Sequence, residues 1–263
     1  MIKFCGLFSG SSGNAIYIKC KNTCVLIDAG VSGTSIIGAL QAIGEDPSKI
    51  SAILITHEHS DHTKGAGILS RKFNIPVYAN ANTWNAMAGS LGKIDLKNIR
   101  CFSTGKELNI NDICVKPFKT PHDAAESVGF SVFAGNKKIT VATDMGFIFE
   151  GLLDELEGSD VVLIESNHDV EMLKTGPYPW PLKKRVLGEN GHLSNDMAGE
   201  VVMQLGKRGT GRFLLGHLSE QNNFPELAYQ TVINILQENG FHVGKDILLN
   251  VLPRNCPGEV INL

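Results

Sequence analysis

The chain has 263 residues, of which 43% are hydrophobic and 19% are charged, and its net charge is −3. These values are ordinary for a globular protein with a large core, and they exclude a disordered chain. The near-neutral charge gives no sign of the strongly basic surface that marks many nucleic-acid-binding proteins. Bound metal ions would add positive charge that this count omits, so the charge alone does not exclude a nucleic-acid substrate.

The cysteines and the apolar segments indicate a cytoplasmic protein. No two cysteines form a CxxC pair, and the amino-terminal stretch has no continuous apolar segment with a cleavage site. No run approaches the ~18 apolar residues needed to span a bilayer. We therefore expect reduced thiols and no membrane contact. The six cysteines are Cys5, Cys20, Cys24, Cys101, Cys114 and Cys256.

The first half of the chain alternates strand and helix signals. Short apolar segments bounded by glycine, serine or asparagine predict strands, and segments with helical apolar spacing that end at glycine or asparagine predict helices. The expected strands are 3–8, 15–20, 24–30, 51–56 and 76–79, and the expected helices are 32–44, 67–74 and 82–92.

The second half repeats this rhythm. The expected strands are 112–120, 127–135, 137–144, 159–166, 212–218 and 245–250, and the expected helices are 147–158, 195–209 and 224–240. Two similar sets of strands and helices predict two sheets packed face to face with helices outside. We expect them to form one α/β domain over residues 1–263.

A histidine-rich stretch, HEHSDH at 57–62, directly follows one of the expected buried strands. A solvated loop that happens to be rich in histidine is the alternative to a metal site. Imidazole and carboxylate groups suit Zn²⁺ or Mn²⁺, and no nearby thiolate favours a softer metal. His57 and His59 can turn toward one point, and Asp61 and His62 toward a second, so the stretch predicts a metal site.

Two ions need more ligands than this stretch supplies, and three later residues are candidates. His122, Asp144 and His217 each lie where an expected strand ends and a loop begins, which is where α/β folds place chemistry. Taken alone, each would be a surface residue or a satisfied core residue. Together with the histidine-rich stretch they predict metal ligands, and Asp144 is the natural bridge between two ions.

The order of these residues resembles the metallo-β-lactamase fold superfamily, and LIDAG at 26–30 resembles the Asp-x-Gly turn of that superfamily. The resemblance covers nearly the whole chain and implies a four-layer αβ/βα sandwich with the metals at one edge. It implies the following ligand sets: His57, His59 and His122 for one ion, Asp61, His62 and His217 for the other, and Asp144 between them.

Three further stretches narrow the resemblance to one group within the superfamily. They are 9–18, 164–195 and 215–223, and together they resemble the YycJ (WalJ)-like metallo-hydrolases, which are related to ribonuclease Z and the β-CASP nucleases. This implies a phosphodiesterase with two divalent ions, Zn²⁺ or Mn²⁺, that acts on DNA as a 5′-to-3′ exonuclease. The residues without the resemblance predict only a dinuclear metallohydrolase.

If the reaction is phosphodiester hydrolysis, several residues have expected roles in it. Two ions can hold a water molecule between them and lower its pKa, and Asp61 is expected to accept its proton. His192 is expected to donate a proton to the leaving oxygen, because its position matches the His-Ser-Thr loop of ribonuclease Z-like enzymes; a simple helix cap at this stretch is the alternative. The expected substrate contacts are Ser11, Asn14, His168, Ser194 and Asn195.

A proline-rich stretch at 175–185 places Tyr178 and Trp180 beside three cationic residues, Lys183, Lys184 and Arg185. Aromatic faces with neighbouring cations suit stacked bases and backbone phosphates. The alternative is a proline-rich loop that packs on the body of the protein.

Two other functions compete with the nuclease. A thioesterase resembling glyoxalase II can use the same ligands, and a non-catalytic binding module can keep the fold, although seven intact candidate ligands argue against such a module. A β-lactamase is disfavoured because the chain lacks an export signal and a metal-site cysteine. The segments after His122 and Asp144 are too short for the arm of ribonuclease Z or the cap domain of a β-CASP nuclease. The sequence does not predict the oligomeric state.

Overall fold

The computed structural model describes residues 2–263, and its contacts divide them into two compact units. Unit 1 holds the described residues up to Lys119 together with Ala124–Asn136 and Pro253–Leu263, and unit 2 holds Thr120–Asp123 and Lys137–Leu252. The expected single domain over residues 1–263 stays a prediction. No helix among the described residues is long and apolar enough to cross a membrane.

Unit 1 contains a seven-stranded mixed sheet. Its strands are β1 Ile2–Phe8, β2 Ala15–Cys20, β3 Thr23–Ile27, β4 Ile50–Leu54, β5 Val77–Ala79, β6 Ile99–Cys101 and β14 Ile261–Asn262, in the order β14-β1-β2-β3-β4-β5-β6. β1, β2, β3 and β14 pair antiparallel, whereas β3, β4, β5 and β6 run parallel. The carboxyl ends of β3 and β4 therefore lie side by side at one edge.

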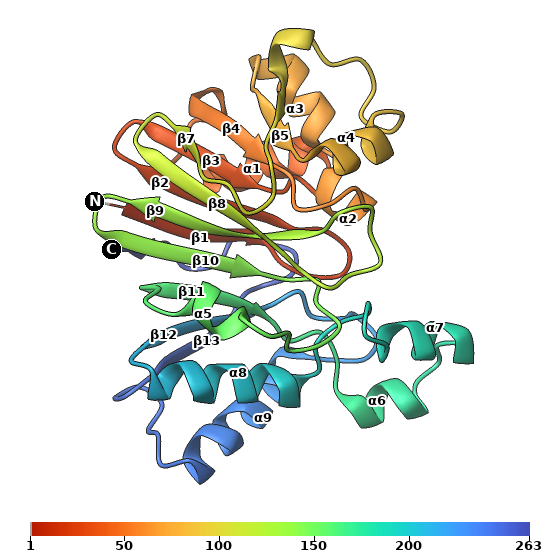
Figure 1. Cartoon of the computed structure of the whole chain (residues 1–263), viewed down its shortest axis with the longest axis vertical. Coiled ribbons are helices and arrows are strands. Elements are labelled where there is room, and N and C mark those ends of the chain that lie inside the picture. The colour runs from red at the N-terminus through yellow and green to blue at the C-terminus, as the bar shows by residue number, and fades with distance from the viewer. Residues whose placement is uncertain (1) are drawn as a thin grey trace. The chain divides into compact units, whose positions relative to one another are not determined.

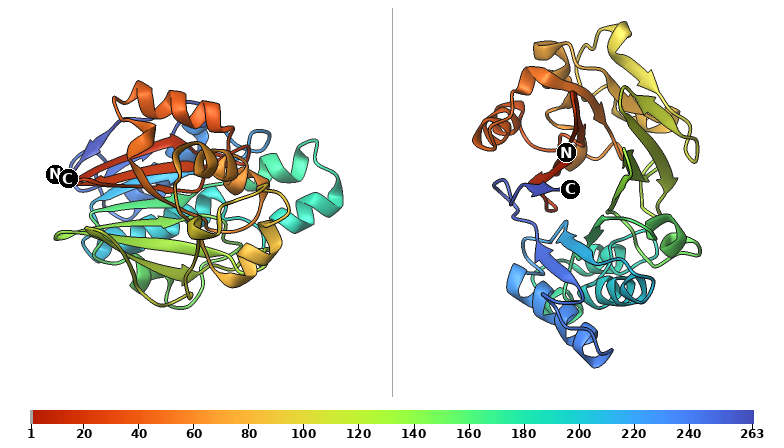
Figure 2. Two further views of the ribbon diagram at one scale, coloured as in Figure 1. Left: turned by 90° about the horizontal axis from the view of Figure 1, so that it is seen from above. Right: turned by 90° about the vertical axis from the view of Figure 1, so that its left-hand side faces the viewer.

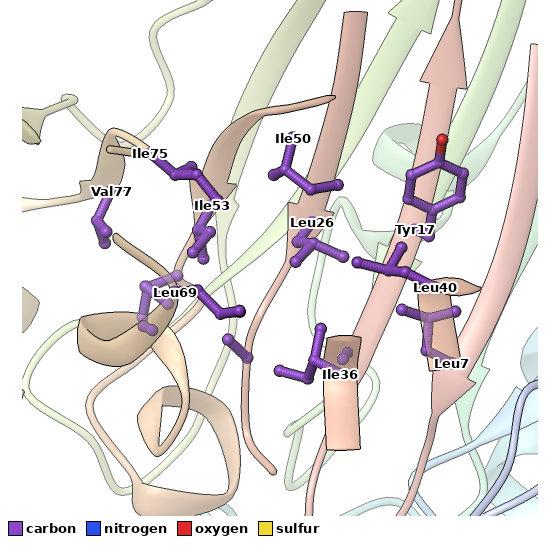
Figure 3. Close-up of a cluster of buried hydrophobic side chains, with 14 of the residues drawn as sticks. Leu7, Tyr17, Leu26, Ile36, Leu40, Ile50, Ile53, Leu69, Ile75 and Val77 are labelled. Carbon is purple, nitrogen blue, oxygen red and sulfur yellow. The ribbon is translucent and has the colours of Figure 1, made fainter. Parts of the chain in front are cut away.

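The helices of unit 1 supply one wall of its hydrophobic core. They are α1 Gly33–Ala42, α2 Ser60–Thr63, α3 Ala66–Phe73 and α4 Ala81–Met87, with 3-10 turns at Pro47–Lys49 and Leu96–Asn98. Ile36 and Leu40 of α1 face Leu26 of the sheet, and Leu69 of α3 lies beside Ile53 (Figure 3). This packing fixes the sheet edge from which the histidine-rich stretch departs.

Unit 1 also holds three antiparallel strands, β7 Leu108–Ile110, β8 Ile113–Lys119 and β9 Val128–Ala134. β8 and β9 match the strands expected at 112–120 and 127–135. β7 has three residues, too few for an alternating apolar pattern to show in the sequence.

Unit 2 contains four parallel strands flanked by helices. The strands are β10 Lys137–Ala142, β11 Val161–Glu165, β12 Arg212–Gly216 and β13 Leu248–Val251, and the helices are α5 Leu152–Leu156, α6 Val170–Thr175, α7 Trp180–Val186, α8 Asn195–Lys207 and α9 Pro225–Glu238. α8 and α9 lie side by side along the strands (Figures 1 and 2). Because β10, β11 and β12 are neighbours and parallel, their carboxyl ends meet at one edge, and the residues that follow them gather there.

Two parts of unit 2 differ from expectation. The helix expected at 147–158 begins only at Leu152, because Gly151 has a left-handed backbone conformation with φ 85° and stands at its N-cap. One alternative for the stretch at 175–185 was a proline-rich loop. Trp180–Val186 instead forms the helix α7, with a proline in its first turn.

Candidate metal centre

The histidine-rich stretch at 57–62 is fixed to the sheet of unit 1 by one carboxylate. Asp28 directly follows β3, and its backbone N–H donates to the carbonyl of Leu54 at the end of β4 (2.8 Å). Its side chain accepts hydrogen bonds from the backbone N–H (2.9 Å) and the hydroxyl (2.9 Å) of Thr56. The Asp-x-Gly turn therefore holds the start of the histidine-rich stretch beside the neighbouring strand.

The same carboxylate orients His62. Its Oδ2 lies 2.7 Å from Nδ1 of His62, and both side chains are buried. Burial raises the pKa of Asp28, and the bonds to His62 and Thr56 offset only part of that effect. A carboxylate that accepts a hydrogen bond from Nδ1 leaves Nε2 as the metal-binding nitrogen, which is the usual arrangement behind a metal-ligating histidine. That Nε2 lies 3.3 Å from Oδ2 of Asp61.

His57 and His59 present ring nitrogens to each other. Nε2 of His57 lies 3.0 Å from Nδ1 of His59, and the two ring centroids are 4.6 Å apart. The other nitrogen of His57, Nδ1, lies 3.0 Å from the Thr56 hydroxyl, so the ring orientation is set from behind. Two imidazole nitrogens that converge in this way, at the end of a buried strand, fit a divalent ion.

A close backbone approach brings the amino-terminal turn to this stretch. The Gly30 N–H donates to the Asn14 carbonyl (2.7 Å), and the Asn14 N–H donates to the Asp61 carbonyl (2.8 Å). A Cβ atom at Gly30 would overlap the Asp61 carbonyl and lie 2.7 Å from the Asn14 nitrogen. The glycine of the Asp-x-Gly turn is therefore required because no side chain fits at this position.

Unit 2 carries a second set of ligand-type residues at neighbouring strand ends. Asp144 follows β10, Glu165 ends β11 and His217 follows β12. Asp144 and His217 have positive φ angles of 61° and 56°, an uncommon conformation for residues with side chains. Strained backbone of this kind gathers at functional sites, where it aims side chains that a regular strand would point elsewhere.

Glu165 joins two histidines, and the sequence analysis did not identify it. Its Oε1 accepts hydrogen bonds from Nδ1 of His192 (2.7 Å) and Nδ1 of His217 (2.8 Å). Its Oε2 accepts bonds from the backbone N–H groups of Met145 (2.9 Å) and Leu193 (3.2 Å). Burial alone would raise the pKa of Glu165, but the two imidazoles facing it lower that pKa to about 2.

The four side chains Asp144, Glu165, His192 and His217 offer ligand atoms that all lie within 4.8 Å of one another. His122 belongs to the same unit: its Nδ1 lies 3.1 Å from the Gly191 carbonyl, and its Nε2 lies 3.7 Å from Oδ1 of Asp144. Burial lowers the pKa of His122, which favours the neutral ring that a metal requires. The imidazole nitrogens and the carboxylate oxygens that unit 2 brings together are therefore suitable ligands for a divalent ion.

The expected substrate contacts have different surroundings. Ser11 is exposed, whereas Asn14 is buried and binds the Gly10 backbone through both ends of its amide (3.1 Å each). His168 is buried, its Nδ1 has no hydrogen-bond partner among the described residues, and burial lowers its pKa to about 4. Ser194 caps α8 by accepting a hydrogen bond from the Met197 N–H (3.2 Å), so the helix cap that was the alternative for this stretch is present.

Asn195 differs from the expected role. It is fully buried, and its side chain binds the Ser166 hydroxyl (2.6 Å) and the amide of Asn223 (2.8 Å). Its backbone N–H donates to the His168 carbonyl (2.9 Å). With these groups engaged, Asn195 ties together the loops that follow β11 and β12, and it presents no side-chain group to a substrate.

The chain matches a family model described as the β-lactamase superfamily domain over residues 23–218. It superposes on the metallo-β-lactamase fold protein YhfI from Bacillus subtilis with a TM-score of 0.73 and 14% identity, over 98% of each chain. The chain belongs to the metallo-β-lactamase superfamily, a family of metal-dependent hydrolases, and the expected fold of two mixed sheets flanked by helices is confirmed. The fold and the histidine–aspartate clusters together indicate divalent-metal binding.

Two bacterial relatives define the group more narrowly. The chain is 42% identical to exodeoxyribonuclease WalJ of Streptococcus pneumoniae serotype 2 over 247 residues, 93% of this chain and 91% of that protein. It is 40% identical to exodeoxyribonuclease YycJ of Bacillus anthracis over 259 residues, 98% of each. The expected resemblance to the YycJ (WalJ)-like proteins is confirmed.

Replacing Gly30 with alanine tests the close approach of the Asp-x-Gly turn. In Gly30→Ala the new methyl group overlaps the Asp61 carbonyl, so the turn or the histidine-rich stretch must move. We expect a loss of at least ~2 kcal/mol in the free energy of unfolding, as for other overpacked sites, and weaker zinc binding. Urea unfolding and zinc titration measure the two effects.

Gly38→Ala is the matched control. Gly38 lies within α1 and a Cβ atom there has open space, so alanine should stabilise the protein by ~0.5–1 kcal/mol. Equal stability and equal zinc affinity in the two variants would show that a side chain does fit at Gly30.

Replacing Glu165 with glutamine tests its hold on the two histidines. The amide keeps the shape, but it has no negative charge and its oxygen can occupy only one of the two carboxylate positions. Its NH₂ group then faces either the two ring N–H donors or the backbone N–H groups of Met145 and Leu193, so the hold on His192 and His217 weakens. We expect zinc affinity to fall ~10–100-fold, the usual effect of removing a group that orients a ligand. Competition with a chelating dye measures the affinity. Glu200→Gln, on the exposed side of α8, is the control, and a Glu165→Gln affinity no weaker than that control would refute the role.

Proposed function

We propose that this protein is a divalent-metal-dependent phosphodiesterase that removes nucleotides from DNA as a 5′-to-3′ exonuclease. The observation that carries the proposal is Glu165, whose carboxylate binds both a candidate metal ligand, His217, and a candidate proton donor, His192. An enzyme that cleaves a phosphodiester needs a metal ion and a proton donor at fixed positions. The buried Glu165 carboxylate orients both the candidate metal ligand and the candidate proton donor. The two exodeoxyribonuclease relatives support DNA as the substrate.

The ligand assignment is part of the proposal. We assign two ions, Zn²⁺ or Mn²⁺, to the following residues: His57, His59 and His122 for one, Asp61, His62 and His217 for the other, and Asp144 for both. Support comes from each unit separately, because each presents imidazole nitrogens and carboxylate oxygens from the ends of parallel strands. When bound, such a pair supplies Lewis acidity and lowers the pKa of water.

The remaining chemistry falls to the side chains. Asp61 is partly exposed, at 24% of its side chain, so its carboxylate can accept a proton from an attacking water. His192 is 16% exposed, and its Nδ1 donates to Glu165. When the ring carries a proton on both nitrogens, Nε2–H can pass its proton to the leaving oxygen, and the ring is left neutral with Nδ1–H still bound to Glu165. Ser11, His168 and Ser194 are proposed to position the phosphate. We propose that the protein is cytoplasmic, where it would have access to DNA.

Replacing Asp61 with asparagine tests the proposed chemistry. The amide keeps the shape but loses the negative charge, so it holds a cation less well and accepts no proton at neutral pH. We expect the hydrolysis of bis(4-nitrophenyl) phosphate and of end-labelled DNA to fall at least ~10³-fold. Asp154→Asn, at an exposed position of α5, is the matched control and should keep full activity.

The same assay separates the nuclease from its competitors. Zn²⁺- or Mn²⁺-loaded wild-type protein should degrade DNA from the 5′ end and leave a thioester substrate intact. Thioester cleavage without any phosphodiester cleavage would show a glyoxalase II-like enzyme instead. Equal binding of DNA by wild type and Asp61→Asn with no cleavage by either would show a binding module.

A further inference from the structure

The segment that contains α6 and α7 carries a group of aromatic and cationic side chains, which we call the aromatic–basic surface: Lys174, Tyr178, Trp180, Lys184 and Arg185. All of them are exposed except Tyr178, which is half-buried in the turn between the two helices. Trp180 is 69% exposed, an unusual position for the largest apolar side chain. Lys184 follows Trp180 by four residues on α7, so the two side chains lie on one face of the helix. Figure 1 shows α6 and α7 beyond the carboxyl ends of the strands of unit 2.

The charge of this segment is opposite to that of the chain. Residues 170–188 contain four cationic residues and one acidic residue, 4 − 1 = +3, whereas the whole chain has a net charge of −3. The surplus is therefore a local feature of α6 and α7. A positive segment on a negative protein favours a polyanion as its partner.

The cations of the segment have separate roles. Lys183 is buried, and its ammonium group donates to the carbonyl of Lys174 (2.7 Å), which fastens α7 to the last turn of α6. Arg185 pairs with Asp123 and is still half exposed. Lys184 is exposed beside Trp180. One cation thus fixes the two helices together, and the others face solvent.

The end of α7 is built into the candidate metal centre of unit 2. The His192 N–H donates to the Val186 carbonyl (3.1 Å), and Gly191 holds His122 through its carbonyl. Asp123, the partner of Arg185, directly follows His122. A ligand that binds the exposed face of α7 is therefore held by the same structural unit as His192, the proposed proton donor.

We propose that the aromatic–basic surface binds the single-stranded part of the DNA substrate, with a base stacked on Trp180 and phosphates facing Lys184 and Arg185. This inference rests on the proposed function, and it narrows the substrate to DNA with an unpaired segment. An exposed indole stacks on a base only when that base is unpaired and outside a helix, and neighbouring cations fit the backbone. Duplex DNA without an unpaired segment binds this surface weakly.

Trp180 itself provides the first measurement. The chain has two tryptophans, Trp84 and Trp180, so Trp84→Phe leaves Trp180 as the sole indole. In this variant a 12-nucleotide phosphorothioate oligothymidine should quench the tryptophan fluorescence in a saturable way. Blunt duplex DNA of the same length should quench it much less. Vesicles of anionic lipid should leave it unchanged, and a blue shift with vesicles but not with oligothymidine would show a membrane surface and overturn the proposal.

Substitution variants provide the second measurement, the dissociation constant for a labelled oligothymidine. Trp180→Ala should weaken binding about 5- to 100-fold, the range for losing one stacked base, and Trp180→Phe should recover part of that loss. Lys184→Glu should also weaken binding, and more so at low salt. Lys245→Glu makes the same charge change at the exposed turn before β13 and should bind as wild type.

The outcomes separate this inference from the proposed function. Hydrolysis of bis(4-nitrophenyl) phosphate by the wild-type protein tests the chemistry, because that substrate has no base to stack. If the wild type hydrolyses it and Trp180→Ala binds oligothymidine as well as Lys245→Glu does, the aromatic–basic surface is not the binding site and the proposed function stands. If no metal supports hydrolysis, the proposed function fails, whatever the fluorescence shows.

Discussion

The candidate metal centre depends on the hydrogen bonds that two buried carboxylates make with the Nδ1 atoms of its histidines. Asp28 binds Nδ1 of His62 in unit 1, and Glu165 binds Nδ1 of both His192 and His217 in unit 2. An imidazole has two nitrogens, and fixing one of them sets both the tautomer and the direction of the other. Without these carboxylates, His62, His192 and His217 would lose the hydrogen bond that sets their tautomer and ring orientation.

The parallel strands explain why the carboxylates and their histidines meet. In each unit, neighbouring parallel strands end at the same edge, so residues far apart in the sequence emerge side by side. Asp28, Asp144 and His217 each adopt a left-handed backbone conformation one or two residues after a strand, with φ between 56° and 62°. Such positions cost on the order of 1–3 kcal/mol each, and the surrounding hydrogen bonds and packing offset that cost. The sheets therefore act as the rigid support, and the strained residues aim the side chains.

The sequence was a good guide wherever a local pattern carried the information. The histidine-rich stretch, the strands before Asp144 and His217, and the Ser194 cap were predictable because spacing and capping chemistry act over a few residues. Glu165 was not predictable from the residues alone, because it is the last residue of a buried strand and its partners lie 27 and 52 positions away. A charged residue at the end of an otherwise apolar strand, SDVVLIES, was the one signal that could have pointed to it.

Other features escaped for different physical reasons. Asn195 was among the expected substrate contacts, but tertiary contacts with Ser166 and Asn223 engage its amide. α7 was obscured by Pro177, Pro179 and Pro181, which favour turns in sequence patterns although a proline is tolerated in the first turn of a helix. Pattern reasoning weighs residue types, whereas these outcomes depend on which partner a residue meets in the folded chain.

The central proposal is that the chain binds two divalent ions that share Asp144 as a ligand. Electron paramagnetic resonance of the Mn²⁺-loaded protein tests it most directly, because two Mn²⁺ ions that share a bridging ligand couple magnetically. We predict an exchange-coupled spectrum that appears as the second equivalent of Mn²⁺ binds and is lost in the Asp144→Asn variant. A spectrum of isolated Mn²⁺ ions at every loading would contradict the claim.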